Sequence, residues 1–297
     1  MPDLGRLKDR SPRWAKTLAD RSTRSVALAT SGLRPPPDFL VIGTKRGGTT
    51  SMFNYLLMHP GVLGLFPQSR GKKSTDYFFK ERARGDRWYR SHFHTRPYRA
   101  LLRRRHGHVP VGGEASPYYM YDPRVAPLAA ALHPGLRAIA LLRNPVERAW
   151  SHYQERVHMG VEPLSFTEAL DREHERTAGE VERMHADPSY YSSAHDWYSY
   201  RDRGIYLPQL QAWEAAFPAG RLLVLTSEEM YRDVQGVVAR VWSFLDVPPF
   251  RLPTTKSFNT ITRSPIPDDT RAELAEFYAP HNLALEAHLG RSVGWGD

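Results

Sequence analysis

The sequence predicts an α/β fold in which helices flank both faces of a central parallel sheet. Three observations point to it: short apolar runs suited to strands buried on both faces, helical spacing of apolar residues between those runs, and a glycine-rich turn directly after the first run. Strands that alternate with helices form parallel sheets, because each crossover helix returns the chain to the starting edge. A chain of 297 residues is long enough to bury the core of one large domain of this class.

Four apolar runs are the strand candidates. They are residues 38–43, 75–79, 137–142 and 221–226. Apolar residues recur at helical spacing after the first run, and then around residues 123–133, 145–158, 207–217, 229–245 and 268–289. The arginine-rich span 82–108 is the least regular part of the chain, and we expect it to form helix and loop over one edge of the sheet.

Residues 1–37 differ from the rest of the chain. They alternate charged and small residues and end in three prolines after Arg34, which predicts a mobile or loosely packed basic extension closed by a stiff linker. We therefore place a single domain at residues 38–297. No stretch approaches the roughly 20 apolar residues of a membrane-spanning helix, and the extension lacks the apolar core of a signal peptide, so we expect a cytoplasmic protein.

The composition is that of a basic globular protein. Lysine and arginine number 41 against 32 aspartates and glutamates, which gives a formal net charge of +9. Such a surface attracts polyanions: nucleic acid, anionic lipid or a small substrate with several phosphates. A nucleic-acid-binding protein is therefore one alternative, but the chain has no helix-turn-helix, zinc-finger or RNA-binding signature. Cysteine is absent and no spacing of His, Asp and Glu suggests a metal site.

The strongest local signal is the glycine-rich segment 43–51, here called the glycine loop, which joins the first strand candidate to a helix. Backbone N–H groups turned inward by glycines, together with the positive end of a helix, favour an anion. The residues that we expect to bind it are Lys45, Arg46, Gly47, Gly48, Thr49, Thr50 and Ser51. A glycine loop at this place makes the predicted fold one of the P-loop type.

The glycine loop differs at one position from the loop that binds nucleoside triphosphates. A Walker A loop has the form G-x-x-x-x-G-K-[ST], and Thr49 stands where that pattern has lysine. In addition, the third strand candidate ends in Arg143, where an ATPase has a carboxylate for Mg²⁺. Both observations weigh against a P-loop kinase or NTPase, the other alternative.

A second candidate anion site follows that strand. Arg143 directly follows the carboxyl end of the strand, Pro145 begins an amphipathic helix, and Ser151 lies two turns into that helix. Ligands of open parallel sheets bind at this edge, so we expect Arg143 and Ser151 to approach the same phosphate. An ion pair between Arg143 and Glu147 is the alternative.

Together the two motifs resemble those of the sulfotransferases that use 3′-phosphoadenosine-5′-phosphosulfate (PAPS), in particular the heparan-sulfate-type and related bacterial enzymes. The shared patterns are G-x-x-[KR]-x-G-T-T-S and R-[ND]-P-x-x-R-x-x-S-x-Y, and similar segments extend the resemblance over about residues 38–295. One of them, residues 113–119, is similar to the family's E-K-[ST]-P-x-Y segment. The resemblance implies transfer of a sulfuryl group to a hydroxyl or amine, on a carbohydrate or a secondary metabolite, with adenosine 3′,5′-bisphosphate (PAP) as the product.

The resemblance also implies roles for individual residues. Arg46 stands in the place of the loop lysine that contacts the bridging oxygen of the leaving phosphate, and Lys45 lies beside it. The rest of the glycine loop would contact the 5′-phosphate, and Arg143 and Ser151 the 3′-phosphate. Lys256 lies where the family has a basic loop that closes over the nucleotide. No metal is expected, because a sulfuryl group carries less negative charge than a phosphoryl group.

The general base is the point at which this chain departs from the family pattern. The family has a glutamate three positions before its paired phenylalanines, and this chain has Thr75 there. Asp76 is the preferred substitute, although alternation along a strand would turn it to the opposite face unless a bulge intervenes. Glu114, at the end of another possible strand, is the second candidate.

Two further features concern the acceptor. Aromatic side chains are concentrated in residues 190–200, where they either face a sugar or planar ring or pack as a core seam. The cluster from Arg103 to Arg105 either recruits an acidic acceptor or forms a solvated face. The sequence thus predicts a small-molecule or glycan acceptor, and it leaves the acceptor's identity and the oligomeric state open.

Overall fold

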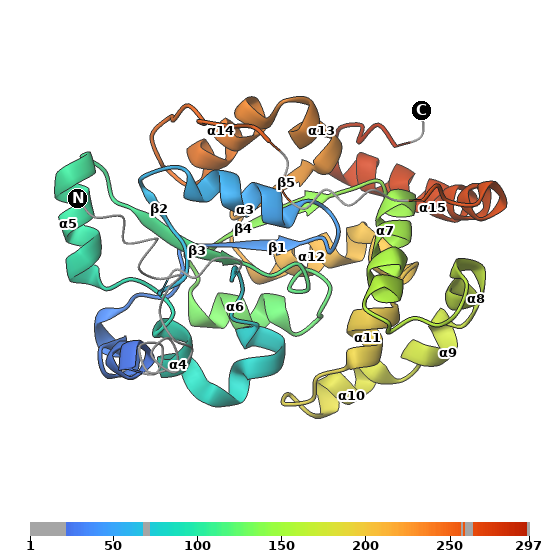
Figure 1. Cartoon of the computed structure of the whole chain (residues 1–297), viewed down its shortest axis with the longest axis horizontal. Helices are drawn as coiled ribbons and strands as arrows, with labels where there is room; N and C mark the ends of the chain where they lie inside the picture. The colour runs from blue at the N-terminus through green and yellow to red at the C-terminus, as the bar shows by residue number, and fades with distance from the viewer. Residues whose placement is uncertain (1–21, 68–71, 257, 259–263, 296–297) are drawn as a thin grey trace, which may run out of the picture.

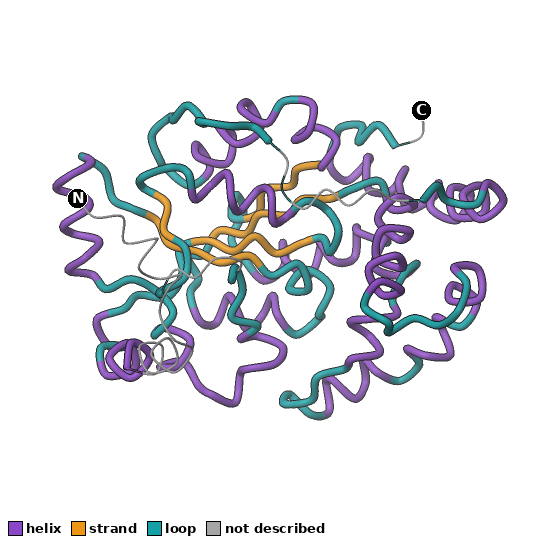
Figure 2. The backbone as a smooth tube through the Cα atoms, viewed as in Figure 1, coloured by secondary structure: helices purple, strands orange, loops and turns teal. Residues whose placement is uncertain are grey.

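The computed structural model describes residues 22–67, 72–256, 258 and 264–295. At its centre is a five-stranded sheet in the order β2-β3-β1-β4-β5, in which every neighbouring pair of strands is parallel. The strands are β1 (Phe39–Gly43), β2 (Val62–Leu63), β3 (Val111–Ala115), β4 (Arg137–Leu142) and β5 (Leu222–Thr226). Figure 1 and Figure 2 show the strands between two layers of helices, which confirms the predicted architecture.

The two faces of the sheet bury separate cores, because successive side chains of a strand point to opposite sides. In β1, Leu40 and Ile42 belong to one core, whereas Phe39 and Val41 belong to the other. The helices that cover the first core are α6 (Val125–Leu132) and α12 (Tyr206–Ala216), and those that cover the second are α3 (Thr49–Leu57), α13 (Ser227–Arg232) and α14 (Val234–Phe244).

A third group of helices lies beyond the carboxyl ends of the strands, at the right of Figure 1. It contains α7 (Pro145–His158), α8 (Phe166–Asp171), α9 (Glu173–Thr177), α10 (Glu180–Ala186), α11 (Ser193–Tyr198), the short turn η4 (Asp202–Gly204) and α15 (Asp268–Leu289). α7 begins as predicted, with Pro145 in its first turn and the Asn144 side chain accepting a hydrogen bond from the N–H of Val146. This group stands beside the sheet edge at which α/β proteins bind ligands.

Most predicted elements are present. The predicted strands at 38–43, 137–142 and 221–226 are β1, β4 and β5. The six predicted helical segments are α3, α6, α7, α12, the pair α13 and α14, and α15. Each of these helices buries apolar side chains against the sheet or its neighbours, for example Leu210 and Trp213 in α12 and Leu274 and Leu285 in α15.

The prediction of a strand at 75–79 is wrong. Residues 75 and 76 are loop, and Tyr77–Glu81 forms a π-helical turn, η2. Asp76 has a φ of 57°, which ends any extended run, and Tyr77 then stacks on Tyr89 with ring centroids 4.2 Å apart. The apolar run therefore fills the core as a turn of helix and not as a strand.

Part of the predicted N-terminal extension packs against the domain. Residues 22–29 are helical and are followed by η1 (Ser31–Leu33). The Arg34 side chain is buried and its guanidinium donates to the Phe93 carbonyl, while Arg24 donates to the Phe66 carbonyl. Residues 1–21 lie outside the described residues, so a loosely packed extension there stays a prediction.

The arginine-rich span forms helix and loop, as predicted. Its elements are η3 (Arg82–Arg84), α4 (Gly85–Arg90) and α5 (Arg96–His106). In Figure 1, α5 lies beside the β2 edge of the sheet, at the opposite end of the molecule from α7 and α11. None of the helices in the described ranges is long and apolar enough to cross a membrane.

Candidate functional site

The glycine loop joins β1 to α3 at the carboxyl edge of the sheet. Gly47 has no room for a side chain, because a Cβ there would lie 2.5 Å from the Leu141 carbonyl oxygen. Gly48 has a φ of 85° and is the N-cap of α3. Residues 49–51 then begin the helix, so their N–H groups are among those that a helix leaves without an intrahelical partner. The loop is therefore shaped to receive an anion at a helix N-terminus.

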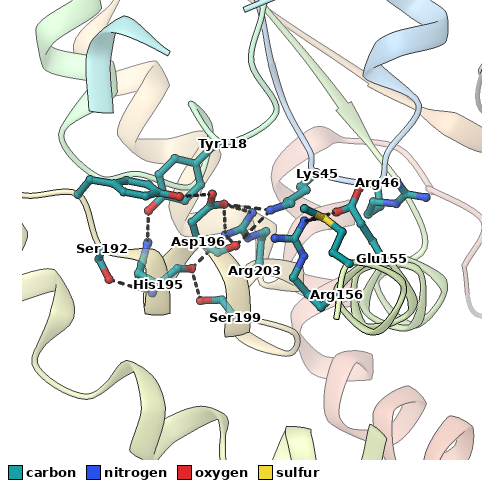
Figure 3. Close-up of polar contacts among 12 residues, drawn as sticks. Lys45, Arg46, Tyr118, Glu155, Arg156, Ser192, His195, Asp196, Ser199 and Arg203 are labelled. Carbon is teal, nitrogen blue, oxygen red and sulfur yellow. Dashed lines mark hydrogen bonds and ion pairs between the residues drawn. The ribbon is translucent and has the colours of Figure 1, made fainter. Parts of the chain in front are cut away.

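Lys45 points from the glycine loop toward α11 (Figure 3). Its Nζ lies 3.1 Å from Oδ1 of Asp196, which also accepts a hydrogen bond from Arg203 at 3.3 Å. Burial lowers the pKa of the Lys45 ammonium to about 8, against the opposing influence of Asp196. Burial would raise the pKa of Asp196, but Lys45 and Arg203 outweigh it and hold that pKa at about 2. Lys45 thus faces an ionised carboxylate that is itself fixed by a buried arginine.

Arg46 brings the two predicted anion motifs together. Its Nε donates to Ser151 Oγ at 2.9 Å, and one Nη lies 2.8 Å from Glu155 Oε1, so its guanidinium contacts α7 at two points. The guanidinium of Arg143 in turn donates to the Arg46 carbonyl at 3.1 Å. The alternative pair of Arg143 with Glu147 is present only as a long contact of 3.8 Å. Residues predicted for two phosphates therefore lie in direct contact.

Lys73 is a site residue that the sequence reasoning missed. Its Nζ lies 2.7 Å from Thr50 Oγ1 and 3.1 Å from Thr49 Oγ1. Burial lowers the pKa of the Lys73 ammonium to about 8. The Lys73 carbonyl accepts from the Ala115 N–H, and Ala115 stands where the family's E-K-[ST]-P pattern has lysine. The sequence signal for Lys73 was indirect: the pattern's lysine is absent at position 115, so another cation could be expected near the glycine loop.

The segment around Lys256 and Phe258, here called the late segment, was expected to close over the nucleotide, and it packs on α3. Ser51 Oγ donates to the Phe258 carbonyl at 3.1 Å and accepts from the Phe258 N–H at 3.2 Å. The Tyr55 hydroxyl donates to the Lys256 carbonyl at 3.1 Å. The Lys256 side chain is exposed. Ser51, predicted to contact the nucleotide, therefore uses its hydroxyl to hold this segment.

The two base candidates have different surroundings. Glu114 is fully buried and accepts from the Thr75 N–H at 2.6 Å and from the hydroxyls of Tyr89 and Tyr119 at 2.8 and 2.9 Å. Burial raises the pKa of Glu114 to about 7. With this set of donors, Glu114 ties the segment around Thr75 to β3. Asp76 is half-buried, and its Oδ1 accepts from the Ser74 hydroxyl.

A pocket of about 180 Å³ opens beside the glycine loop, and it is here called the Tyr118 pocket. Its lining residues are Lys45, Asp76, Phe79, Lys80, Ser116, Pro117, Tyr118, Tyr191 and Asp196. Asp76 is thus in the pocket and Glu114 is not among the lining residues. The expectation that alternation would turn Asp76 away does not apply, because the segment is not a strand.

The aromatic span 190–200 divides between pocket and core. Tyr191 lines the Tyr118 pocket, and its hydroxyl donates to Asp196 at 2.8 Å. Tyr190 instead donates to Glu180. His195 stacks on Tyr121 and its Nδ1 lies 2.7 Å from the Tyr118 hydroxyl, which fixes the Tyr118 ring (Figure 3). In the described part of the chain, no three His, Asp or Glu side chains are arranged to hold a metal ion.

Comparison with known proteins gives one family. Residues 36–273 match the family model described as "Sulfotransferase domain". A solved structure, the sulfotransferase from Alicyclobacillus acidocaldarius, is similar with a TM-score of 0.65 and 29% identity, over 88% of this chain and 99% of that one.

Curated relatives are more distant and several are longer. The human heparan sulfate glucosamine 3-O-sulfotransferase 6 is 27% identical over 89% of this chain and 75% of its own length. The membrane-associated sulfotransferase kil1 of Dictyostelium discoideum is 25% identical, and the match covers 87% of this chain and 66% of that protein. The human bifunctional heparan sulfate N-deacetylase/N-sulfotransferase 2 is also 25% identical, over 96% of this chain and only 33% of the relative.

Proposed function

Because this chain belongs to the sulfotransferase domain family, we propose that it transfers a sulfuryl group from PAPS to a hydroxyl or amine of a small-molecule or glycan acceptor. The observation that supports this most strongly is the contact between the two anion motifs, the Arg143 guanidinium on the Arg46 carbonyl. PAPS has phosphates on both ends of its ribose, so its binding site needs two groups of cations held close together. The cytoplasmic location stays a prediction.

In this proposal the donor binds across the glycine loop and the start of α7. Lys45, Arg46 and Lys73 surround the 5′-phosphosulfate, together with the N–H groups of Gly48, Thr49 and Thr50. Arg143 holds the 3′-phosphate, with Ser151 beside it. Arg46 now pairs with Glu155 and Lys45 with Asp196, so the donor's oxygens compete with two carboxylates for these cations. Lys256 stays a weaker candidate for a nucleotide contact. Its carbonyl accepts a hydrogen bond from Tyr55 on α3, and its side chain is exposed.

The reaction needs two things from the protein, stabilisation of the leaving group's charge and a base for the acceptor's proton. The acceptor oxygen or nitrogen attacks sulfur in line, the bond from sulfur to the 5′-phosphate oxygen breaks, and the electron pair stays on that oxygen as PAP leaves. Lys45 and Arg46 stabilise the charge that develops there, as cations do in phosphoryl transfer. Asp76, from the wall of the Tyr118 pocket, takes the acceptor's proton. These side chains supply the charge balance of the step, so we propose that it does not depend on a metal.

Ligand-induced stabilisation tests the proposal. A ligand that binds only the folded state at a hundred times its dissociation constant raises the free energy of unfolding by about 2.7 kcal/mol. We expect PAP to raise the melting temperature, and ATP with Mg²⁺ to raise it less. Arg143→Ala abolishes the shift with PAP, whereas Arg104→Ala on the exposed face of α5 keeps it. A shift with ATP and Mg²⁺ alone contradicts the proposal.

A further inference from the structure

The Tyr118 pocket is electrically balanced, in contrast to the whole chain. Its charged lining residues are two cations, Lys45 and Lys80, and two carboxylates, Asp76 and Asp196. The chain as a whole has a net charge of +9, so the excess positive charge lies elsewhere. A pocket that recognises sulfate or carboxylate groups needs unpaired arginine or lysine side chains. Here Lys45 is paired with Asp196, which Arg203 from behind the lining also contacts, and the other two charged lining residues are the exposed Lys80 and the half-buried Asp76.

Three aromatic rings, those of Phe79, Tyr118 and Tyr191, are among the lining residues and pack against one another. The ring centroid of Phe79 lies 4.7 Å from that of Tyr118 and 5.6 Å from that of Tyr191. The Lys80 ammonium lies over the Tyr191 ring at 5.5 Å from its centroid. Faces of this kind pack against a flat or ring-shaped molecule.

The size of the pocket limits what it holds. Its volume is about 180 Å³, and a cavity of about 150 Å³ in another protein accommodates one benzene molecule. The Tyr118 pocket therefore has room for one six-membered ring. A longer molecule would leave its remaining rings outside, along the surface.

The arginine-rich helix α5 does not add positive charge near the Tyr118 pocket. Arg103, Arg104 and Arg105 are exposed on α5, but α5 lies at the other end of the molecule from α7 and α11 (Figure 1). A charged polymer seated in the Tyr118 pocket would have to cross the whole molecule to meet them.

We propose that the acceptor is an uncharged molecule with a single hydroxyl-bearing ring, a neutral sugar or a phenol, that enters the Tyr118 pocket and packs on Tyr191. This inference rests on the proposed sulfuryl transfer and specifies its acceptor. The ring hydroxyl attacks sulfur, its proton passes to the Asp76 carboxylate, and the products are a ring sulfate ester and PAP. A polyanionic glycan fits this pocket less well, because Lys80 is the one exposed cation among the lining residues that could offset the desolvation of its charges.

The first experiment compares acceptors. The full chain is incubated with PAPS labelled in the sulfuryl group and with methyl β-glucopyranoside, 4-methylphenol or a heparin-derived oligosaccharide, and label in the acceptor is measured. We expect transfer to one of the two neutral rings with a kcat/KM at least roughly tenfold above that for the oligosaccharide. The two neutral arms distinguish a sugar from a phenol. Preference for the oligosaccharide, or no transfer to any ring in wider panels of neutral sugars and phenols, overturns the inference.

A pair of neighbouring tyrosines tests the packing surface. Tyr191→Ala should raise the KM for the neutral acceptor roughly tenfold and leave the dissociation constant for PAP unchanged. Tyr190→Ala is the matched control, since Tyr190 contacts Glu180 and lies outside the pocket lining. Tyr191→Phe keeps the ring but loses the hydrogen bond to Asp196, and we expect a KM close to that of the unchanged protein. A KM as high in Tyr191→Phe as in Tyr191→Ala overturns the ring contact.

Binding of PAP separates this inference from the one on which it rests. If PAP binds and the neutral rings are not sulfated, the acceptor inference fails and the proposed function stands. If PAP does not bind at all, the proposed function fails first.

Discussion

The glycine loop and the Tyr118 pocket share Lys45, but they are built in different ways. The glycine loop is one continuous segment whose shape depends on its backbone: Arg46 and Gly48 both have positive φ values, 70° and 85°. The Tyr118 pocket is assembled from side chains of several separate segments, among them Asp76 and Asp196. The first region is therefore specified locally, and the second only by the folded chain.

Their charges differ as well. Around the glycine loop, Lys45, Arg46, Lys73 and Arg143 outnumber the carboxylates that face them, Glu147, Glu155 and Asp196. The lining of the pocket has equal numbers of each sign. The comparison suggests that the donor is held by charge and the acceptor by shape. The predictions below test that division.

The largest effect is expected where the pocket supplies the base. Asp76→Asn should lower kcat for sulfuryl transfer roughly 10²–10⁴-fold, because an amide does not accept the acceptor's proton. The dissociation constant for PAP, measured by calorimetry, should not change. An unchanged kcat would remove Asp76 from the mechanism.

Glu114 provides the contrast to Asp76. Glu114→Ala leaves three buried donors without an acceptor, so we expect the free energy of unfolding to fall by about 3 kcal/mol in urea titrations. A stably folded Glu114→Gln variant that loses activity as strongly as Asp76→Asn would instead make Glu114 the base.

A smaller effect is expected on the donor side. Lys73→Ala should weaken PAP roughly 10- to 100-fold, since it removes a charged hydrogen-bond donor beside Thr49 and Thr50. Binding of adenosine 3′-monophosphate, which lacks the 5′-phosphate, should be unaffected. Lys72→Ala is the matched control, because Lys72 is the exposed neighbour. Equal losses for both nucleotides would show that Lys73 acts on the fold of the loop and not on the 5′-phosphate.

The smallest effect concerns pH. Burial holds the pKa of Lys45 and of Lys73 at about 8, so both ammonium groups are charged below that pH and lose their charge above it. An anionic ligand binds the charged form, so PAP affinity should fall several-fold between about pH 7 and pH 9.5, and binding near pH 8 should take up protons. Lys73→Arg should make this profile shallower, because arginine keeps its charge throughout and only Lys45 still loses its charge over this range. Affinity that stays constant in the unchanged protein over this range contradicts the prediction.

The fold could be predicted wherever a strand has large apolar side chains, as β1, β4 and β5 do. β3 is fully buried and confirms the possible strand expected at Glu114, but Gly112 and Gly113 keep it from standing out as an apolar run. A Cβ on Gly113 would lie 2.5 Å from the Phe39 carbonyl oxygen, so the close approach of β1 requires glycine there. The two residues of β2 give too short a pattern to detect.

The site could be predicted in part for the same reason. The glycine loop and the start of α7 are local patterns, and the residues expected there lie together. Asp196 is 151 positions from Lys45 along the chain, and no spacing rule connects them. Lys73 lies outside both motifs, and its place became visible only once the strand expected at 75–79 proved to be a loop and a π-helical turn.

The attachment of the late segment to α3 bears on how this protein could be altered. Ser51 and Tyr55 hold it through the main-chain groups of Lys256 and Phe258, and such bonds do not depend on the side chain at position 256. Side chains can therefore be exchanged at that position while the anchor stays in place. If Lys256 contacts the nucleotide, as the family resemblance implies, a library randomised at this position would sample new nucleotide preferences while the anchor stays in place, which makes this short stretch a natural starting point for directed evolution.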